Sequence, residues 1–462
     1  MTEDLFPEFE ASRKADWIAQ ATRDLKGKDF EQSLGSTLWG KIKLSPFYTS
    51  EDLNGPAVQH RFHPQNEIPG LPPRVWTNLI SVLPGDSNQQ VIQALENGAE
   101  GLVLHLHGVE DLSELLKGVL PQYIPIFIFP LGNPVLALRS FFEWADSTGT
   151  SPDLISGGLL WTPSDLVFDR DQPFGLGVEI LSELLEMAEP YPAFKAFSVK
   201  TSRYSESGAN PLEALVFGLG ELIESLDRLF IDPKQVFSKV FFEASVGESH
   251  FGEIARMKAL RKVACEMAGL YGLEIKEQEV LIFSQTSGWS KSLLDVNTNL
   301  VRQTYEAMAA VLGGANFLWV RPLQEENSSE MERRIARNVS TILREESHLD
   351  KVMDPSAGSY YLENLTSEMQ RIIQAELQQL ESRGGWEKSL TNGAIHSLVR
   401  KNREVIQIQV LENQTPKIGA SKYPAPPSLQ KNLELVPFEE KMHELKPTRA
   451  TYLVELQTLT QS

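Results

Sequence analysis

The sequence has few of the features that disulfide-rich, membrane-spanning or nucleic-acid-binding proteins need. Cys265 is the only cysteine among 462 residues, so no disulfide and no cluster of thiolate ligands can form within one chain. The longest apolar stretch, residues 124–138, is interrupted by Pro130, Gly132 and Pro134, which makes it too broken to span a bilayer. The chain has 43 basic and 62 acidic residues. Its net charge of -19 argues against nucleic acid and anionic membranes as partners, since both need a basic surface.

The first residues also lack a targeting signal. The stretch from Met1 to Phe6 is acidic, with no basic region and no apolar run of the kind that a signal peptide needs. We therefore expect a cytoplasmic protein. Cys265 itself lies inside an apolar-periodic helical pattern, and we expect a packed helix residue rather than a reactive nucleophile.

Short apolar runs alternate with amphipathic helical patterns from residue 79 onward. The runs are rich in β-branched and aromatic residues and are bounded by Gly, Pro, Asn or Ser, which is typical of buried strands. Eight such units predict an α/β fold, a (β/α)₈ TIM barrel, and a doubly wound sheet is the alternative. The expected strands are residues 79–83, 102–106, 124–129, 158–161, 196–200, 240–244, 280–283 and 317–320; the expected helices are residues 88–97, 111–119, 134–145, 177–188, 211–229, 251–270, 295–312 and 329–349.

Two flanking segments complete the expected organisation. Residues 1–70 form an N-terminal extension with a short helix at 13–25, and a proline-rich connector at 62–73 leads into the barrel, residues 71–350. Residues 351–462 form a C-terminal helical segment and tail. Within it we expect a turn-rich stretch at 354–361, a helix at 367–383 and then a less regular tail.

Polar residues gather where the expected strands end, and this is the edge at which barrels bind ligands. Gln285 and Ser287 follow the strand 280–283 and are suited to hydrogen-bonding a carbonyl or thioester, or to capping the loop. Arg203 and Glu206 follow another strand, three residues apart. They could clamp an anion and supply a base, or they could be a structural ion pair or free loop charges.

Histidines and charge runs give weaker signals. His105 and His107 lie two apart on an expected strand, so both should point to the same face, as half of a metal site would require. No sequence signature names a third ligand, which favours packed or hydrogen-bonded barrel residues. The charged run at 324–346 carries both signs at helical spacing, and we expect a solvated helix face.

Several stretches together resemble the barrel domain of the methylmalonyl-CoA mutase family, from about Phe6 to about Pro424. The stretch Ser284–Trp289 is similar to the one that the family carries after strand seven. Residues 24–28 and 46–52 resemble the small-subunit branch of the family in particular. Further similar stretches are residues 206–209, 251–256, 334–338, 345–347 and 354–360.

The resemblance implies that the chain belongs to an enzyme whose radical chemistry is performed by a cofactor. The family interconverts methylmalonyl-CoA and succinyl-CoA with adenosylcobalamin, and catalytic members bind the cofactor through Asp-x-His-x-x-Gly in a separate C-terminal domain. None of the eight histidines here has an aspartate two residues before it, and the chain ends about 110 residues after Asp354. We therefore expect that this chain alone binds no cofactor and no metal, and that adenosylcobalamin belongs to the complete enzyme.

The chain departs from the catalytic pattern of the family at several positions. Catalytic members carry Tyr-His where Ser202 and Arg203 stand, and a radical-shielding tyrosine where Ser81 stands. They line the barrel axis with small polar residues, whereas these strands are full of Leu, Ile, Phe and Trp, which indicates a packed core. Arg203, Glu206, Gln285 and Ser287 then form the rim of a vestigial site, and no residue is assigned a catalytic role.

The resemblance therefore implies a non-catalytic small subunit that pairs with a large catalytic mutase subunit and stabilises it, with residues 1–70 in the contact. Two alternatives stay open. The chain could be an active acyl-CoA mutase barrel that uses cobalamin held by a separate subunit. It could instead be a free-standing CoA-binding or regulatory pseudoenzyme, forming a homodimer in isolation.

Overall fold

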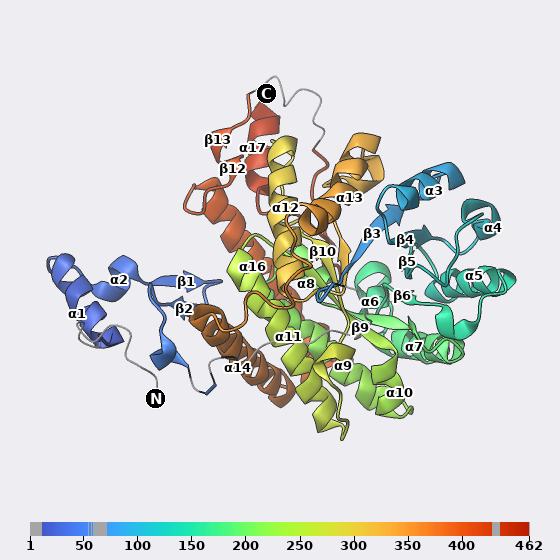
Figure 1. Ribbon diagram of the computed structural model, residues 1–462, viewed down its shortest axis with the longest axis horizontal. Helices are drawn as coiled ribbons and strands as arrows, with labels where there is room; N and C mark the ends of the chain where they lie inside the picture. The colour runs from blue at the N-terminus through green and yellow to red at the C-terminus, as the bar shows by residue number, and fades with distance from the viewer. Residues whose placement is uncertain (1–11, 54, 57, 59–71, 427–434, 462) are drawn as a thin grey trace.

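Parallel strands wind into a nearly closed barrel in the computed structural model, which describes residues 12–53, 55–56, 58, 72–426 and 435–461 (Figure 1). The strand order is β7-β6-β5-β4-β3-β11-β10-β9-β8, and every neighbouring pair is parallel. The predicted TIM-barrel architecture is confirmed. The strands are β3 (Thr77–Val82), β4 (Gly101–Leu106), β5 (Ile126–Pro130), β6 (Gly157–Leu159), β7 (Phe194–Lys195), β8 (Phe197–Lys200), β9 (Val240–Val246), β10 (Ile282–Thr286) and β11 (Phe317–Trp319).

The ninth strand arises because one expected strand is divided. Strands β7 and β8 lie on either side of Ala196, whose backbone amide donates to the carbonyl of Lys239 at 2.8 Å. Strand β7 pairs with β6, whereas β8 pairs with β9. The amide of Ser198 donates to the carbonyl of Trp161 at 3.0 Å and links the two ends of the sheet, so eight βα units close the barrel.

Side chains cap the first turn of several barrel helices. Asn210 accepts from the amide of Leu212 at the start of α9, and Ser329 forms a capping box with Glu332 at the start of α13. The expected helix at 111–119 was wrong in length, since the chain leaves helical geometry and Gly118 has a φ of 81°. The helices are α3 (Asn88–Glu96), α4 (Leu112–Leu115), α5 (Pro134–Ser147), α6 (Ser164–Arg170), α7 (Phe174–Ala188), α8 (Thr201–Glu206), α9 (Pro211–Arg228), α10 (Pro233–Ser238), α11 (His250–Leu270), α12 (Val296–Leu312) and α13 (Glu330–Glu345).

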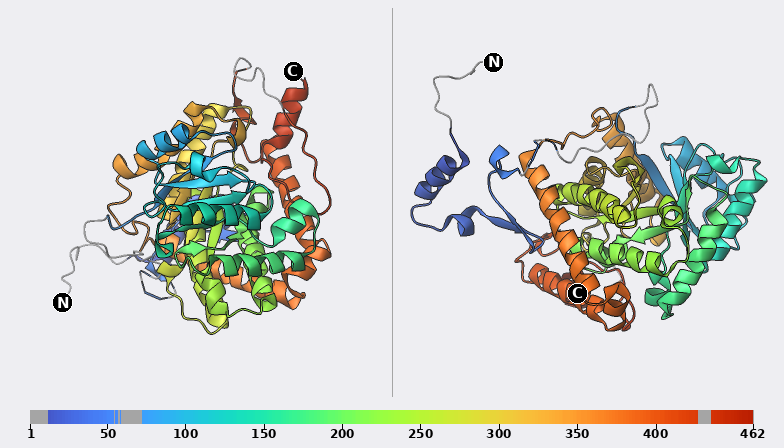
Figure 2. Two further views of the ribbon diagram at one scale, coloured as in Figure 1. Left: turned by 90° about the vertical axis from the view of Figure 1, so that its right-hand side faces the viewer. Right: turned by 90° about the horizontal axis from the view of Figure 1, so that it is seen from below.

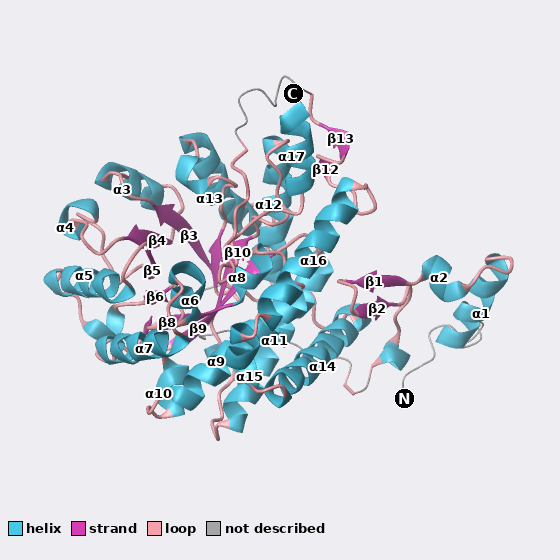
Figure 3. Cartoon of the chain, turned by 180° about the vertical axis from the view of Figure 1, so that it is seen from behind, coloured by secondary structure: helices cyan, strands magenta, loops and turns pink. Residues whose placement is uncertain are grey.

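Helices after the barrel cover one side of it. Helix α14 (Tyr360–Ser382) packs on α11 and α9 (Figure 3). Residues after 383, expected to be a less regular tail, contain α15 (Gly385–Thr391), α16 (Ala394–Leu411) and α17 (Tyr452–Gln461). The expectation was wrong because Gly384 and Gly393, both at positive φ, divide the pattern without ending it.

The N-terminal arm, residues 12–53, projects from the barrel (Figures 1 and 2). It contains α1 (Lys14–Asp24), α2 (Phe30–Leu34) and the antiparallel pair β1 (Ser36–Leu38) and β2 (Ile42–Leu44). Lys41 joins the arm to the barrel side, with its ammonium 2.9 Å from a carboxylate oxygen of Glu213 and paired also with Glu376. Most of the expected connector at 62–73 lies outside the described residues.

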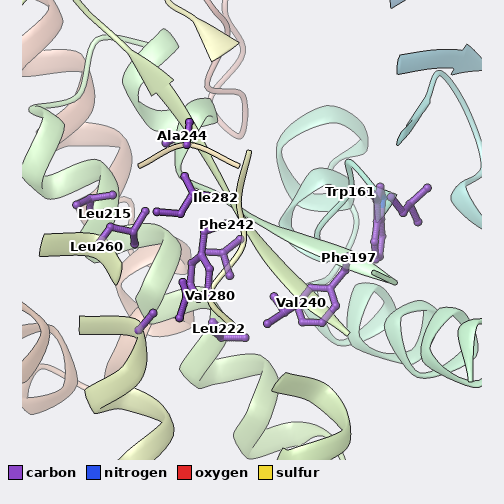
Figure 4. Packing of buried hydrophobic residues seen from close by; sticks show 14 of the residues in the cluster. Trp161, Phe197, Leu215, Leu222, Val240, Phe242, Ala244, Leu260, Val280 and Ile282 are labelled. Carbon is purple, nitrogen blue, oxygen red and sulfur yellow. The ribbon is translucent and has the colours of Figure 1, made fainter. Parts of the chain in front are cut away.

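Two apolar layers follow from the pleat of the strands, in which successive side chains alternate between faces. Phe242 and Ile282 point outward and pack against Leu215, Leu222 and Leu260 of the surrounding helices (Figure 4). Their neighbours Phe241 and Phe283 point inward. Among the described residues, no helix is both long and apolar enough to cross a membrane.

Candidate functional site

Large apolar side chains fill the interior of the barrel. Phe127, Phe241 and Phe283 are completely buried, and the ring of Phe127 lies 5.4 Å from that of Phe241 and 4.8 Å from that of Phe283. The strand register places Val103 beside Phe127 and Leu79 beside Trp319. The expected packed axis is therefore present. The full inner cluster is Leu79, Val103, Phe127, Leu160, Phe241, Phe283 and Trp319.

The first part of the barrel mouth is a polar network around Arg321. Its guanidinium donates to Gln285 at 3.0 Å and to Glu325 at 2.9 Å, and lies 4.4 Å from the ring centre of Trp319. The indole nitrogen of Trp319 donates to the hydroxyl of Ser81 at 2.9 Å, and that hydroxyl bonds in turn to Glu325. These polar groups satisfy one another's hydrogen-bonding capacity above the apolar side chains that fill the barrel.

Glu206 forms a second network that holds the loop after β10. Its carboxylate accepts from the hydroxyl of Ser287 at 2.8 Å and from the backbone amide of Gly288 at 2.8 Å. The hydroxyl of Ser245 at the end of β9 bonds to the same carboxylate. Glu206 is buried, so its contacts join α8 to two strand ends. Of the two roles expected for Ser287, this geometry matches the anchoring of a loop.

Arg203 pairs with aspartates from the preceding βα unit. Its guanidinium lies 2.6 Å from Asp165 and 2.7 Å from Asp169, and the ammonium of Lys200 lies 2.8 Å from Asp165. Burial alone would raise the pKa of Asp165, but the two cations outweigh it and hold that pKa below its usual value. An ion pair between Arg203 and Glu206, one of the expected possibilities, was wrong because each residue is bonded elsewhere.

Ser202 bonds to a carboxyl group inside the barrel. Its hydroxyl donates to Glu243, and the hydroxyl of Ser198 lies 3.4 Å from the other carboxyl oxygen. Glu243 is fully enclosed, and this burial raises its pKa despite the nearby Lys200. The arrangement fixes the side chains of β8, α8 and β9 relative to one another.

The two histidines do not share a face. His105 is buried and stacks on Phe129 at 4.8 Å, and burial lowers its pKa to about 4. His107 is exposed and lies 3.2 Å from Glu110, because β4 ends at Leu106 and the strand alternation stops there. Within the described part of the chain, no three His, Cys, Asp or Glu side chains gather as metal ligands would.

Two further expectations can be compared with the structure. Cys265 is half buried on α11, and burial raises the pKa of its thiol to about 11. The charged run at 324–346 is only partly a solvated face. Arg333 pairs with Asp86 at 2.9 Å, and Arg344 pairs with Glu100, so α13 is tied to the barrel by some of those charges.

Sequence reasoning found the mouth residues but missed most of their partners. Asp165 follows the expected strand 158–161 and could have been found by the same strand-end rule. Glu325 was included only in the charged run, where helical spacing favoured a solvated face. Its distance of 244 residues from Ser81 leaves no local signal of their contact.

Comparisons with known proteins place the sequence among the following relatives. Residues 83–457 match the protein-family model described as methylmalonyl-CoA mutase. The chain is 27% identical over 446 residues to a methylmalonyl-CoA mutase small subunit of Porphyromonas gingivalis, covering 91% of this chain and 71% of that protein. A small subunit of the same name from Streptomyces virginiae is 27% identical over 429 residues, covering 88% and 68%. A methylmalonyl-CoA mutase large subunit of Propionibacterium freudenreichii subsp. shermanii is 26% identical over 334 residues, covering 69% and 45%.

Proposed function

The chain belongs to the methylmalonyl-CoA mutase family, and from this we propose that it is the non-catalytic small subunit of a heterodimeric, adenosylcobalamin-dependent mutase. Its role is to bind the large catalytic subunit and to stabilise it. The complete enzyme interconverts methylmalonyl-CoA and succinyl-CoA. Two curated relatives that carry the small-subunit name support the assignment.

The filled barrel axis is the observation that carries the proposal. A barrel that threads a CoA arm along its axis needs a passage between the strands. Phe127, Phe241 and Phe283 occupy that space here, and Trp319 lies over them with its ring 5.9 Å from that of Phe283. Opening a passage would mean displacing several completely buried rings, each of which contributes to the stability of the core.

The mouth residues support the same assignment. Ser81, Ser202 and Arg203 stand where catalytic members carry Tyr, Tyr and His, and they bond to Glu325, Glu243 and Asp165. Adenosylcobalamin does not fit this described mouth, since its polar groups are bonded to one another and Trp319 fills the space beneath them. We therefore assign the cofactor to the large subunit and no catalytic step to these residues.

The N-terminal arm offers a surface for the partner. Trp17 packs against Phe30 and Phe47 at the end of the arm, and the side chains of Trp17 and Phe47 remain partly exposed. Aromatic side chains exposed together on a projecting segment are typical of a protein contact. The arm therefore supplies part of the heterodimer interface in this proposal.

Mixing the chain with the large subunit of the same organism tests the proposal. Light scattering should show a one-to-one complex, and the large subunit should lose activity more slowly on heating when it is bound. Trp17→Ala should weaken the complex at least about tenfold, as the loss of an interface aromatic does. Phe230→Ala, a fully exposed ring on the barrel, should leave affinity unchanged.

Four results would contradict the proposal. A large subunit that is fully active, stable and never bound by this chain would remove the stabilising role. Turnover by this chain with a separate cobalamin-binding subunit, or protection from heat by CoA, would support the active-barrel alternative. A stable homodimer that excludes the large subunit would support a free-standing pseudoenzyme.

A further inference from the structure

A cleft of about 740 Å³ lies between α3 and α13, outside the barrel wall. The two helices flank β3, the first strand of the barrel (Figure 1). The volume is that of a small-molecule site. Ser81 and Glu325 line its inner end, where their bond, together with Trp319, separates the cleft from the barrel axis. Its apolar lining consists of Ile80, Val82, Val91, Ala94, Val320, Pro322 and Ala336.

Buried contacts fix the spacing of the two helices. The side-chain amide of Asn78, buried in β3, donates to the carbonyl of Gly98 just after α3 at 2.8 Å and to that of Arg337 in α13 at 3.0 Å. Toward the mouth, Arg333 of α13 donates to both carboxylate oxygens of Asp86 at 2.9 Å. The cleft is thus held open by contacts along its length and is not a loose gap between helices.

Two arginines in the cleft have no negative partner among the described residues. Arg334 and Arg337 are three residues apart, which places them on the same side of α13. The Nε atom of Arg337 is buried and has no hydrogen-bond acceptor. Burial and the charge of Arg334 both lower the pKa of Arg337, and Glu330 opposes them only in part.

Of the three acidic groups that line the cleft, two are already engaged, and in the described part of the chain the third, Glu330, forms no ion pair with either arginine. Asp86 pairs with Arg333, and Glu325 pairs with Arg321. A buried donor without an acceptor is destabilising unless a ligand or water supplies one. The site therefore has an unmet requirement for negative charge beside an apolar lining, and the side-chain amides of Gln89, Gln93 and Asn97 complete its rim.

We propose that this cleft binds a phosphate monoester that carries an apolar or aromatic body. Such a phosphate brings roughly two negative charges and three acceptor oxygens, which match a pair of guanidinium groups better than one carboxylate does. The body of the ligand would lie on the apolar lining. The proposal does not depend on the role of the chain as a mutase subunit.

Calorimetric titration of the full chain with naphthyl phosphate tests this inference. Naphthyl phosphate should bind at least about tenfold more tightly than inorganic phosphate or naphthol, since each of these offers only one half of the recognition. Arg334→Gln and Arg337→Gln should each weaken binding at least about tenfold. Arg371→Gln, the same change at an exposed position on α14, should leave it unchanged. Protection from hydrogen exchange on binding should be confined to α3 and α13.

Arg334 is exposed, so Arg334→Gln should keep the unfolding temperature of the parent even if Arg337→Gln does not. Equal affinity of the parent and Arg334→Gln for naphthyl phosphate would overturn the proposal. So would equal affinity for naphthol and naphthyl phosphate, or no binding at millimolar concentration.

Discussion

The rings of Phe127 and Phe283 meet edge to face inside the barrel, with their centroids 4.8 Å apart. The two residues come from β5 and β10, which are separated by three other strands in the sheet. Their contact therefore crosses the interior and does not run along the wall. Edge-to-face packing of buried rings adds to the free energy gained from burial alone.

Phe127→Ala should lower the free energy of unfolding by about 3 to 5 kcal/mol, because it leaves a cavity that the surrounding strands cannot close. Urea unfolding followed by tryptophan fluorescence measures the change. Phe230→Ala, which removes a fully exposed ring, should change stability by less than about 0.5 kcal/mol. Similar values for the two variants would mean that the barrel interior is not tightly packed.

Asp165→Asn should destabilise the protein far more than Asp169→Asn, although both aspartates contact Arg203. Asp165 is buried between two cations, and breaking such a pair costs about 3 to 5 kcal/mol. The side chain of Asp169 is 54% exposed, so its loss should cost at most about 1 kcal/mol. Thermal unfolding of both variants measures the difference, and equal shifts would refute this account of the mouth.

His105 should make the protein less stable in mild acid. Its pKa of about 4 in the folded state lies below the ordinary value of 6.5, so the unfolded chain binds the proton first as pH falls. Its contribution is complete above about pH 6.5 and is lost as pH falls toward 4; between pH 7 and pH 5 the loss is about 2 kcal/mol.

His105→Phe keeps a ring on Phe129 and should remove that part of the acid sensitivity. Urea midpoints at pH 7 and pH 5 measure it against the parent protein. His107→Phe, the same change at a side chain that is 56% exposed, is the matched control. An unchanged acid response in His105→Phe would exclude His105 as its source.

Lys41→Met should loosen the N-terminal arm without unfolding the barrel. Lys41 pairs with Glu213 and Glu376, two residues on helices of the body, whereas its neighbour Lys43 is exposed. Hydrogen exchange of residues 36–44 should become several-fold faster in Lys41→Met and stay unchanged in Lys43→Met, since exchange follows local opening. Equal exchange in both variants would mean that other contacts hold the arm.

The barrel could be predicted because each of its strands is buried on both faces and therefore forms a short apolar run. Residues 240–244 are an example, with Phe241 pointing inward and Phe242 outward. Helix α8 could not be predicted, because six residues are too few to show a helical period. Helix α16 was also missed, and Gly393 at positive φ separates it from the helical pattern before it.

Only part of the site could be predicted from the sequence. The rule that strand ends carry the polar residues located Glu206 and Ser287, but it did not reveal that they bond to each other across 81 residues. Ion pairs could not be predicted from nearness in sequence either. Arg203 has Glu206 three residues away but pairs with Asp165 in the folded chain. Which side chains bond to one another depends on which strand ends are neighbours, and only the closed barrel determines that.

The packing of Phe127, Phe241 and Phe283 has a consequence for how other molecules meet this barrel. A hollow barrel recognises its ligand from within, by the shape of a bore. A filled barrel can bind other molecules only through its outer surface. That surface includes the outer helices, the cleft between α3 and α13 and the projecting N-terminal arm. Selection on such a chain would therefore act on its exterior, while the interior is free to accept whichever side chains pack most densely.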